Sequence, residues 1–421
     1  MLESFRKGRS KSPDGSCVIL HRLVRRDEDQ WQATRSCLGG RPSLDRFSWP
    51  RGMHCIAQID LAELAGLGMS HPMPDTGTLA FFADTGSFSG SDHRGTVRMI
   101  EDDAADPAPQ SFYIRPLYGD DWESYDITAG SIGKADAPTV FPRWPVGMVR
   151  ADQKRDGKEL DELDLYTPDL DTVFGPAASS VHLDLSEFAP STLGPDCAKA
   201  DREIWPFPAR VATAILKDVL RVALSYQDVA AVPGEDALGS TIAGIKSSME
   251  TLRPIVERVG EWHDRLSTLD PNAPLGTSLG HAFASDLMAW KGRFYIDNRK
   301  RLSFGSGTTT TASAALATYF QMYVGDRRSH DAIPDLIRVQ METTRMRSAY
   351  SSEAPHQLFG FGTNIQESDN ADRGMILLLQ VATDEAVGFM WGDVGVLQYW
   401  IAPEDLAAGL WDKVEFVMHG H

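Results

Sequence analysis

The sequence is poor in cysteine, and the few cysteines that it has are widely spaced. The 421 residues include 4 cysteines, and no two of them form a Cys-x-x-Cys pair. Disulfide-stabilised domains are much richer in cysteine, and structural zinc sites use closely spaced pairs, so both classes are disfavoured. We therefore expect reduced, buried thiols at Cys17, Cys37, Cys55 and Cys197.

Long apolar runs and several familiar site motifs are also missing. No stretch approaches the roughly 20 apolar residues that a membrane helix requires. No His-x-x-x-His pair and no Walker phosphate loop occur in the chain, which leaves metal and nucleotide sites without support. We therefore expect a cytoplasmic protein with no cofactor and no bound metal, and we assign no catalytic residues. Whether the protein is an enzyme stays open, with a non-catalytic role as the expectation.

Positive charge is scarce relative to negative charge. The chain has 41 lysine and arginine residues against 59 aspartate and glutamate residues, which gives a formal net charge of -18. Nucleic acids and anionic membranes repel such a protein, so we expect neither as a partner. The same charge suits a basic protein partner, although an acidic surface also serves solubility alone.

One motif is present twice, close to the two ends of the chain. Asp75 begins the run DTGTLAFF, and Asp393 begins the run DVGVLQYW. Each run follows an apolar stretch that is interrupted by one glutamine, Gln58 in the first copy and Gln380 in the second. The glycine can adopt positive φ, and the leucine and aromatic residues after it favour a strand. The repeat predicts two similar β-rich modules that pack against each other.

The segment between the two copies has a different character. Residues 151 to about 205 are acidic and rich in loop-forming residues, and from 209 to 350 apolar residues recur with helical spacing. Pro254 is expected to kink or stop one of these helices. We predict an α+β fold of two pseudo-repeated antiparallel modules, at 1–150 and 355–421, with a mostly helical insertion at 151–354.

Four residues of the repeat are candidates for a ligand site. Asp75 and Asp393 would form a carboxylate pair if the two modules faced each other across a cleft. Alternatively, each aspartate caps its own turn before the following glycine. Gln58 and Gln380 interrupt apolar runs, so burial would require their amides to be hydrogen-bonded. They satisfy a neighbouring turn, or they present a symmetric polar pair to a ligand.

Several short motifs resemble the YwqG-like family of bacterial proteins. They are GGRP at 39–42, WP at 49–50, AQIDL at 57–61, LLQ at 378–380 and MWGDVG at 390–395. The resemblance implies an α+β fold with an internal pseudo-repeat, and it implies no established catalytic residues. Some members of the family occur in toxin and immunity gene neighbourhoods. Our first hypothesis is therefore a non-catalytic protein-binding factor, such as an immunity or accessory protein for a basic toxin. The alternative is an enzyme or small-ligand binder that uses a cleft between the two modules.

Overall fold

The computed structural model divides the chain into two compact units. The first contains Met1–Asp126, Ala137–Leu183 and Met341–His421, and the second contains Ile127–Asp136 and Asp184–Gln340. The structure describes residues 16–25, 28–44, 48–69, 71–87, 93–101, 117, 139–152, 208–217, 219–220, 239–290, 294–297, 300–302, 317–343, 354–363, 374–384, 386–392 and 394–420.

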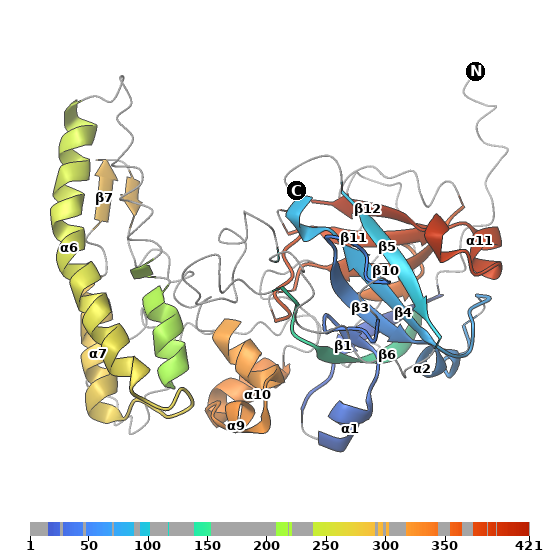
Figure 1. The fold of residues 1–421 in the computed structure, drawn as a ribbon, viewed down its shortest axis with the longest axis horizontal. Coiled ribbons are helices and arrows are strands. Elements are labelled where there is room, and N and C mark those ends of the chain that lie inside the picture. Colours follow the sequence, from blue (N-terminus) through green and yellow to red (C-terminus); the bar gives the residue numbers. More distant parts are fainter. Residues whose placement is uncertain are drawn as a thin grey trace. The chain divides into compact units, whose positions relative to one another are not determined.

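The first unit is built on one large antiparallel sheet (Figure 1). Its ten strands lie in the order β12-β11-β10-β9-β1-β6-β2-β3-β4-β5. Strands from the beginning and the end of the chain are thus hydrogen-bonded in a single sheet. The strands are β1 (Ser16–Arg22), β2 (Cys37–Leu38), β3 (His54–Asp60), β4 (Thr78–Ala83), β5 (Gly95–Ile100), β6 (Trp144–Asp152), β9 (Gln357–Phe359), β10 (Ile376–Ala382), β11 (Val396–Ile401) and β12 (Glu415–His419).

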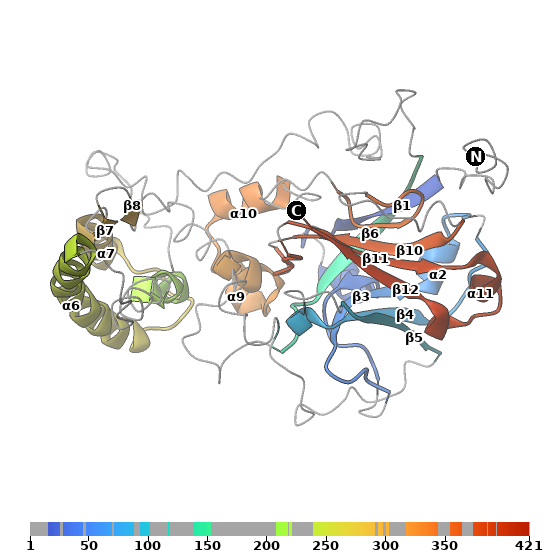
Figure 2. The ribbon, with the colours of Figure 1, turned by 90° about the horizontal axis from the view of Figure 1, so that it is seen from above.

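The sheet curls into a nearly closed barrel, so that its two edge strands approach each other (Figure 2). Phe416 of β12 lies against the main chain of Gly95 in β5. The Tyr399 hydroxyl donates a hydrogen bond to the carbonyl oxygen of Phe82 at 3.0 Å, and the Tyr399 ring contacts that of Phe81. Side chains of the C-terminal strands therefore pack directly on the N-terminal strands. The α+β class is confirmed.

The strand pairs β3–β4 and β10–β11, each one strand in from an edge of the sheet, have matching irregularities. The β3–β4 register shifts between Cys55 and Ala57, and the β10–β11 register shifts between Leu377 and Leu379. Each shift inserts one extra residue in the form of a β-bulge. Gln58 lies opposite Cys37 on one side and Ala80 on the other. Gln380 lies opposite Gln357 and Gln398.

Short helices follow the strands where local signals predict them. The Asp60 carboxylate accepts hydrogen bonds from the main-chain nitrogens of Ala62 and Glu63, at 2.9 and 3.0 Å, and so caps α2 (Leu61–Ala65). Proline begins α11 (Pro403–Ala407). Helix α1 spans Glu28–Ala33, and short 3-10 turns lie at η2 (Thr85–Ser87) and η6 (Trp411–Lys413).

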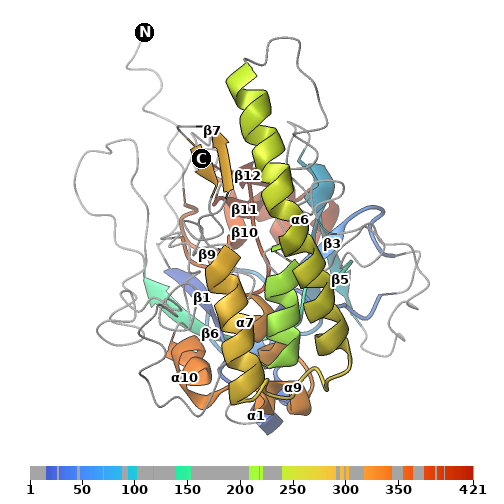
Figure 3. The ribbon, with the colours of Figure 1, turned by 90° about the vertical axis from the view of Figure 1, so that its left-hand side faces the viewer.

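The second unit is mostly helical. It contains α6 (Gly239–Ser267), α7 (Thr277–Trp290) and α9 (Arg327–Asp331), the beginning of α10 (Asp335–Thr343), and a small hairpin of β7 (Phe294–Asp297) and β8 (Lys300–Leu302). Helices α6 and α7 lie side by side (Figure 3). The buried Trp262 ring of α6 packs edge-on against Phe283 of α7, and its indole nitrogen donates to Asp286 at 2.7 Å.

One expectation for this unit is wrong in part. Pro254 does not stop its helix, because α6 continues through it to Ser267. The turns after the proline bury Ile255, Val259, Trp262 and Leu266, which recur at intervals of three or four residues along one face. Burial of this face offsets the hydrogen bond that proline removes.

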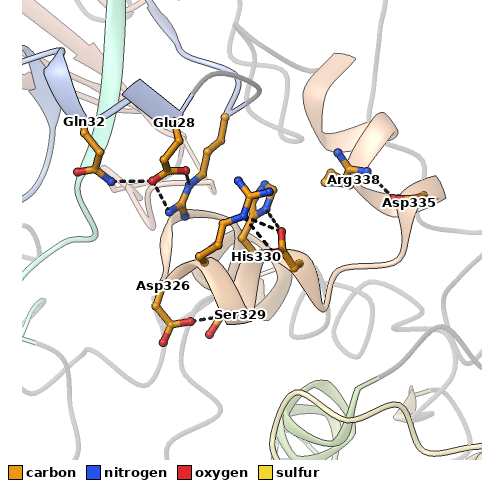
Figure 4. Close-up of polar contacts among 10 residues, drawn as sticks. Glu28, Gln32, Asp326, Ser329, His330, Asp335 and Arg338 are labelled. Carbon is orange, nitrogen blue, oxygen red and sulfur yellow. Dashed lines mark hydrogen bonds and ion pairs between the residues drawn. The ribbon is translucent and has the colours of Figure 1, made fainter. Parts of the chain in front are cut away.

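Local polar contacts fix the ends of the short helices (Figure 4). In α1, Glu28 accepts a hydrogen bond from the Gln32 amide at 2.8 Å and pairs with Arg25. Asp326 caps α9 by accepting from the main-chain nitrogen of Ser329 at 2.7 Å. In the part of the chain that the structure describes, no helix is both long and apolar enough to cross a membrane.

Candidate functional site

Three buried glutamines lie side by side across the C-terminal strands. Gln357, Gln380 and Gln398 are in register on β9, β10 and β11, and their side chains are 0%, 0% and 1% exposed. The amide nitrogen of Gln398 donates to the Gln380 amide oxygen at 2.9 Å. The Trp400 indole donates to the Gln398 oxygen at 3.1 Å. We call the three residues the glutamine ladder.

The glutamine ladder holds the chain segment 355–363 through its main chain. The Gln380 oxygen accepts from the Thr363 nitrogen at 2.7 Å, and the Gln380 nitrogen donates to Pro355 O and Thr363 Oγ1, both at 3.0 Å. Gln398 donates to Thr363 O at 2.8 Å. Gln380 therefore makes all four hydrogen bonds that a primary amide can make, which removes the cost of burying it. Its amide bonds to the segment around Pro355 and Thr363, and a role of Gln380 in ligand binding stays a prediction.

Gln58 has the corresponding strand position but a different environment. Its amide nitrogen donates to Gly39 O at 2.9 Å and lies 3.4 Å from the Cys37 sulfur. The side chain is half-buried, whereas that of Gln380 is completely buried. The two glutamines thus share a register and differ in access to solvent.

Of the two aspartates of the repeat, the structure describes only Asp75. Asp75 lies on an exposed turn before β4, and Asp393 lies outside the described residues. Gly77 has φ of 98°, as the turn was expected to require. In the second copy, glycine is required at position 395 for steric reasons instead, because a Cβ there would collide with the carbonyl oxygen of His419. Whether Asp75 and Asp393 form a pair therefore stays a prediction.

Sequence reasoning missed a buried ionic cluster in the first unit. The Asp384 carboxylate lies 3.3 Å from Arg22 NH1 and 3.1 Å from His356 Nε2, and it accepts from the Ala386 nitrogen at 2.9 Å. All three side chains are at most 5% exposed. They come from β1, from the residue before β9 and from the turn after β10, so no local spacing in the sequence could have indicated them.

The hydrogen bonds of the cluster indicate which nitrogen of His356 carries the proton. The Ala382 main-chain nitrogen donates to His356 Nδ1 at 3.1 Å, so Nδ1 is an acceptor and Nε2 carries the proton that is donated to Asp384. Burial alone would raise the pKa of Asp384. Arg22, His356 and the Ala386 N–H together outweigh burial, and the pKa of Asp384 is lowered. The Arg22 guanidinium also lies 5.1 Å from the centre of the Trp144 ring. Both His356 nitrogens are engaged, so the arrangement suits stability better than proton transfer.

The described cysteines are buried and free of disulfides, as expected. Burial raises the pKa of Cys37 to about 11 and raises that of Cys55 well above its usual value. Such thiols are poor nucleophiles at neutral pH. Cys197 lies outside the described residues.

A metal centre and a serine nucleophile both lack support in the part of the chain that the structure describes. Among the described residues, no group of three or more His, Cys, Asp or Glu side chains is placed to hold a metal ion. Gly276–Gly280 reads GTSLG and has the Gly-x-Ser-x-Gly spacing of a nucleophile elbow. The serine of such an elbow follows a strand, whereas residues 275 and 276 are irregular and Ser278 lies on the exposed first turn of α7. The structural context of the motif is therefore absent.

Comparison with known proteins gives a match to one family model over part of the chain. Residues 282–419 match the model of a family described as a domain of unknown function, DUF1963. The match covers β9 to β12 and extends back into α7. No curated protein matches the chain. The comparison therefore assigns no role to the glutamine ladder or to the ionic cluster.

Proposed function

We propose that the chain is a YwqG-like protein whose barrel arose by duplication of one β-unit. The registers support this, because the bulges at Ile56 and Leu378 are each two residues before the glutamine. The strand that follows each glutamine has an aromatic residue at the matching position, Phe81 in β4 and Tyr399 in β11. The helical segment before β9 is an insertion between the two halves.

The proposed function is non-catalytic capture of a basic protein partner, as an immunity or accessory factor for a toxin. The observation that carries the proposal is the net charge of -18. A field of this sign accelerates encounter with a basic partner and opposes binding of acidic ones. The most deeply buried polar groups, in the glutamine ladder and the Asp384 cluster, bond to other parts of the same chain. These groups stabilise the barrel, which leaves its charged surface to make the intermolecular contacts.

Co-expression with the products of the adjacent genes tests this function. We expect a basic product to co-purify with the chain, with a dissociation constant that rises steeply as salt is added. A matched control is an acidic neighbouring product, or an unrelated basic protein of similar size. Absence of binding to every neighbouring product would remove the proposal, and so would binding that salt does not weaken.

A second candidate function is binding of a small ligand between the two halves of the barrel, by Gln58, Asp75, Gln380 and Asp393. The half-buried state of Gln58 favours it, since that amide is accessible. Gln380 contributes less support, because its hydrogen bonds are all made within the chain. The candidate requires the Asp75 and Asp393 carboxylates to lie within a few ångströms of each other. A crystal structure in which each carboxylate bonds only to its own turn would reject it.

A further inference from the structure

Leu410 differs from every other large hydrophobic side chain in the described part of the chain, because it alone is exposed. Its exposed fraction is 42%. The residue lies directly after α11, between that helix and the η6 turn (Figure 1). Single exposed leucines are common on protein surfaces, so the surroundings of this one decide whether it has a role.

The end of α11 is a Schellman motif that leaves Leu410 uncovered. Gly409 has φ of 67°, and its N–H donates to Leu406 O at 3.1 Å. The N–H of Leu410 donates to Asp405 O at 2.9 Å. In this motif the residue after the glycine is commonly apolar and packs on an apolar residue near the end of the helix. Asp405 and Glu404 occupy the corresponding helix positions here. The helix therefore offers Leu410 two acidic neighbours and no apolar one.

The acidic side chains of this segment lack cationic partners. Residues 374–421 contain seven aspartates and glutamates and a single lysine, Lys413, which is a far larger imbalance than 59 to 41 in the whole chain. Among the described residues, no basic side chain forms an ion pair with Glu404, Asp405 or Asp412. Glu404 is exposed, and Asp405 is half-exposed. Their carboxylates are therefore available to a cation from outside the chain.

An exposed apolar side chain beside two unpaired carboxylates suits one class of partner group. Lysine and arginine side chains have an apolar stem and a cationic head, and they commonly lay the stem along an apolar surface. A neutral apolar ligand would desolvate the carboxylates without compensation, and an anion would be repelled by them. The chemistry therefore favours a cationic side chain, which is what a basic protein presents.

We infer that Leu410, Glu404 and Asp405 form a docking surface for a lysine or arginine side chain of the basic partner. The stem of that side chain packs on Leu410, and its head pairs with the two carboxylates. The inference rests on the proposed function, because it names a contact that the captured protein makes. The surface is fixed by its own main chain, since Ala408 N donates to Glu404 O at 3.1 Å and Lys413 N donates to Leu410 O at 3.0 Å. Binding therefore requires little ordering of the main chain.

The test uses the full chain labelled with ¹⁵N and a blocked dodecapeptide of alternating lysine and alanine. NMR spectra follow the main-chain amide of Leu410 and the indole N–H of the adjacent Trp411 as peptide is added. We expect saturable shifts of both signals with this peptide, and none with a peptide of alternating glutamate and alanine.

Variants locate the contact. Glu404→Gln should weaken binding of the lysine peptide by about two- to fivefold, because exposed ion pairs contribute up to about 1 kcal/mol. Leu410→Ser should weaken it by about three- to tenfold, through loss of apolar contact with the stem. Asp29→Asn removes an exposed carboxylate of α1 and should leave the affinity unchanged.

Two results would overturn the inference. One is the absence of saturable shifts at Leu410 and Trp411 in the unaltered chain, which requires no variant to fold. The other is an affinity in Glu404→Gln and Leu410→Ser equal to that in Asp29→Asn, with thermal melting used to verify that each variant is folded. Equal affinities would mean that the peptide responds only to the overall negative charge.

Failure of this inference can be distinguished from failure of the proposed function. If no neighbouring gene product binds, the proposed function fails while the peptide shifts at Leu410 persist. If a basic neighbouring product binds the unaltered chain, Glu404→Gln and Leu410→Ser with equal affinity, then capture stands and the docking surface is rejected.

Discussion

Asp384 provides the sharpest test of how the barrel is held together. Substitution Asp384→Asn keeps the shape of the side chain and removes its charge. Arg22, which is 4% exposed, would then be a buried cation without its carboxylate. Breaking a buried ion pair in this way typically costs about 3–5 kcal/mol. A domain of this kind is stable by only about 5–15 kcal/mol, so we expect the loss to be a large part of the unfolding free energy of the first unit.

Urea denaturation followed by tryptophan fluorescence measures this effect. The matched control is Asp412→Asn, at an exposed position of η6, which should alter the unfolding free energy by less than about 0.5 kcal/mol. If Asp384→Asn were as stable as the control, then the ionic cluster would not stabilise the barrel. The interpretation of Arg22, His356 and Asp384 as structural groups would then be refuted.

The pH dependence of stability follows from the same carboxylate. The pKa of Asp384 is lowered in the folded state, so its contribution is complete above the pKa of an unfolded aspartate, near 4. That contribution is lost as the pH falls through the lower, folded value. We expect the unfolding free energy to decrease below about pH 4, and to do so less steeply in Asp384→Asn. If the unfolding free energy fell equally steeply with pH in the two proteins, this assignment would be contradicted.

Three further predictions concern other parts of the first unit. Gln380→Leu leaves the Thr363 N–H and the Pro355 carbonyl without partners, so we expect a loss of about 2–4 kcal/mol in denaturation, and clearly less for Gln58→Leu. Gly395→Ala places a methyl group against His419 O and should lower the melting temperature more than Gly66→Ala, where φ is -62° and the Cβ would meet only an ordinary contact at 3.7 Å. Because burial raises the pKa of Cys37 to about 11, iodoacetamide should label Cys37 and Cys55 at pH 8 only after unfolding. Fast labelling of the folded protein would show that these thiols are accessible.

The elements that the sequence predicts well are those with a local physical signal. Asp60 is an N-cap because its carboxylate reaches nitrogens two and three residues ahead, and Pro403 begins a helix because its φ is already helical. The glutamines at 58 and 380 are recognisable because each interrupts an apolar run. Gln398 could have been found by the same reasoning, since it occupies the repeated motif where the first copy has Ala80.

The features that the sequence does not predict depend on contacts between distant residues. Arg22 and Asp384 are 362 positions apart, and only the pairing of β1 with β9, and of β9 with β10, brings their strands together. Pro254 is a local signal that tertiary packing overrides, because the face beginning at Ile255 is buried.

The ionic-strength dependence of the association rate tests the proposed function most directly. The chain would be mixed in a stopped-flow instrument with a basic neighbouring gene product, over a series of salt concentrations. A capture driven by the charge of -18 predicts an association rate constant that falls steeply with added salt and a dissociation rate constant that changes little. An association rate that is insensitive to salt would contradict the account.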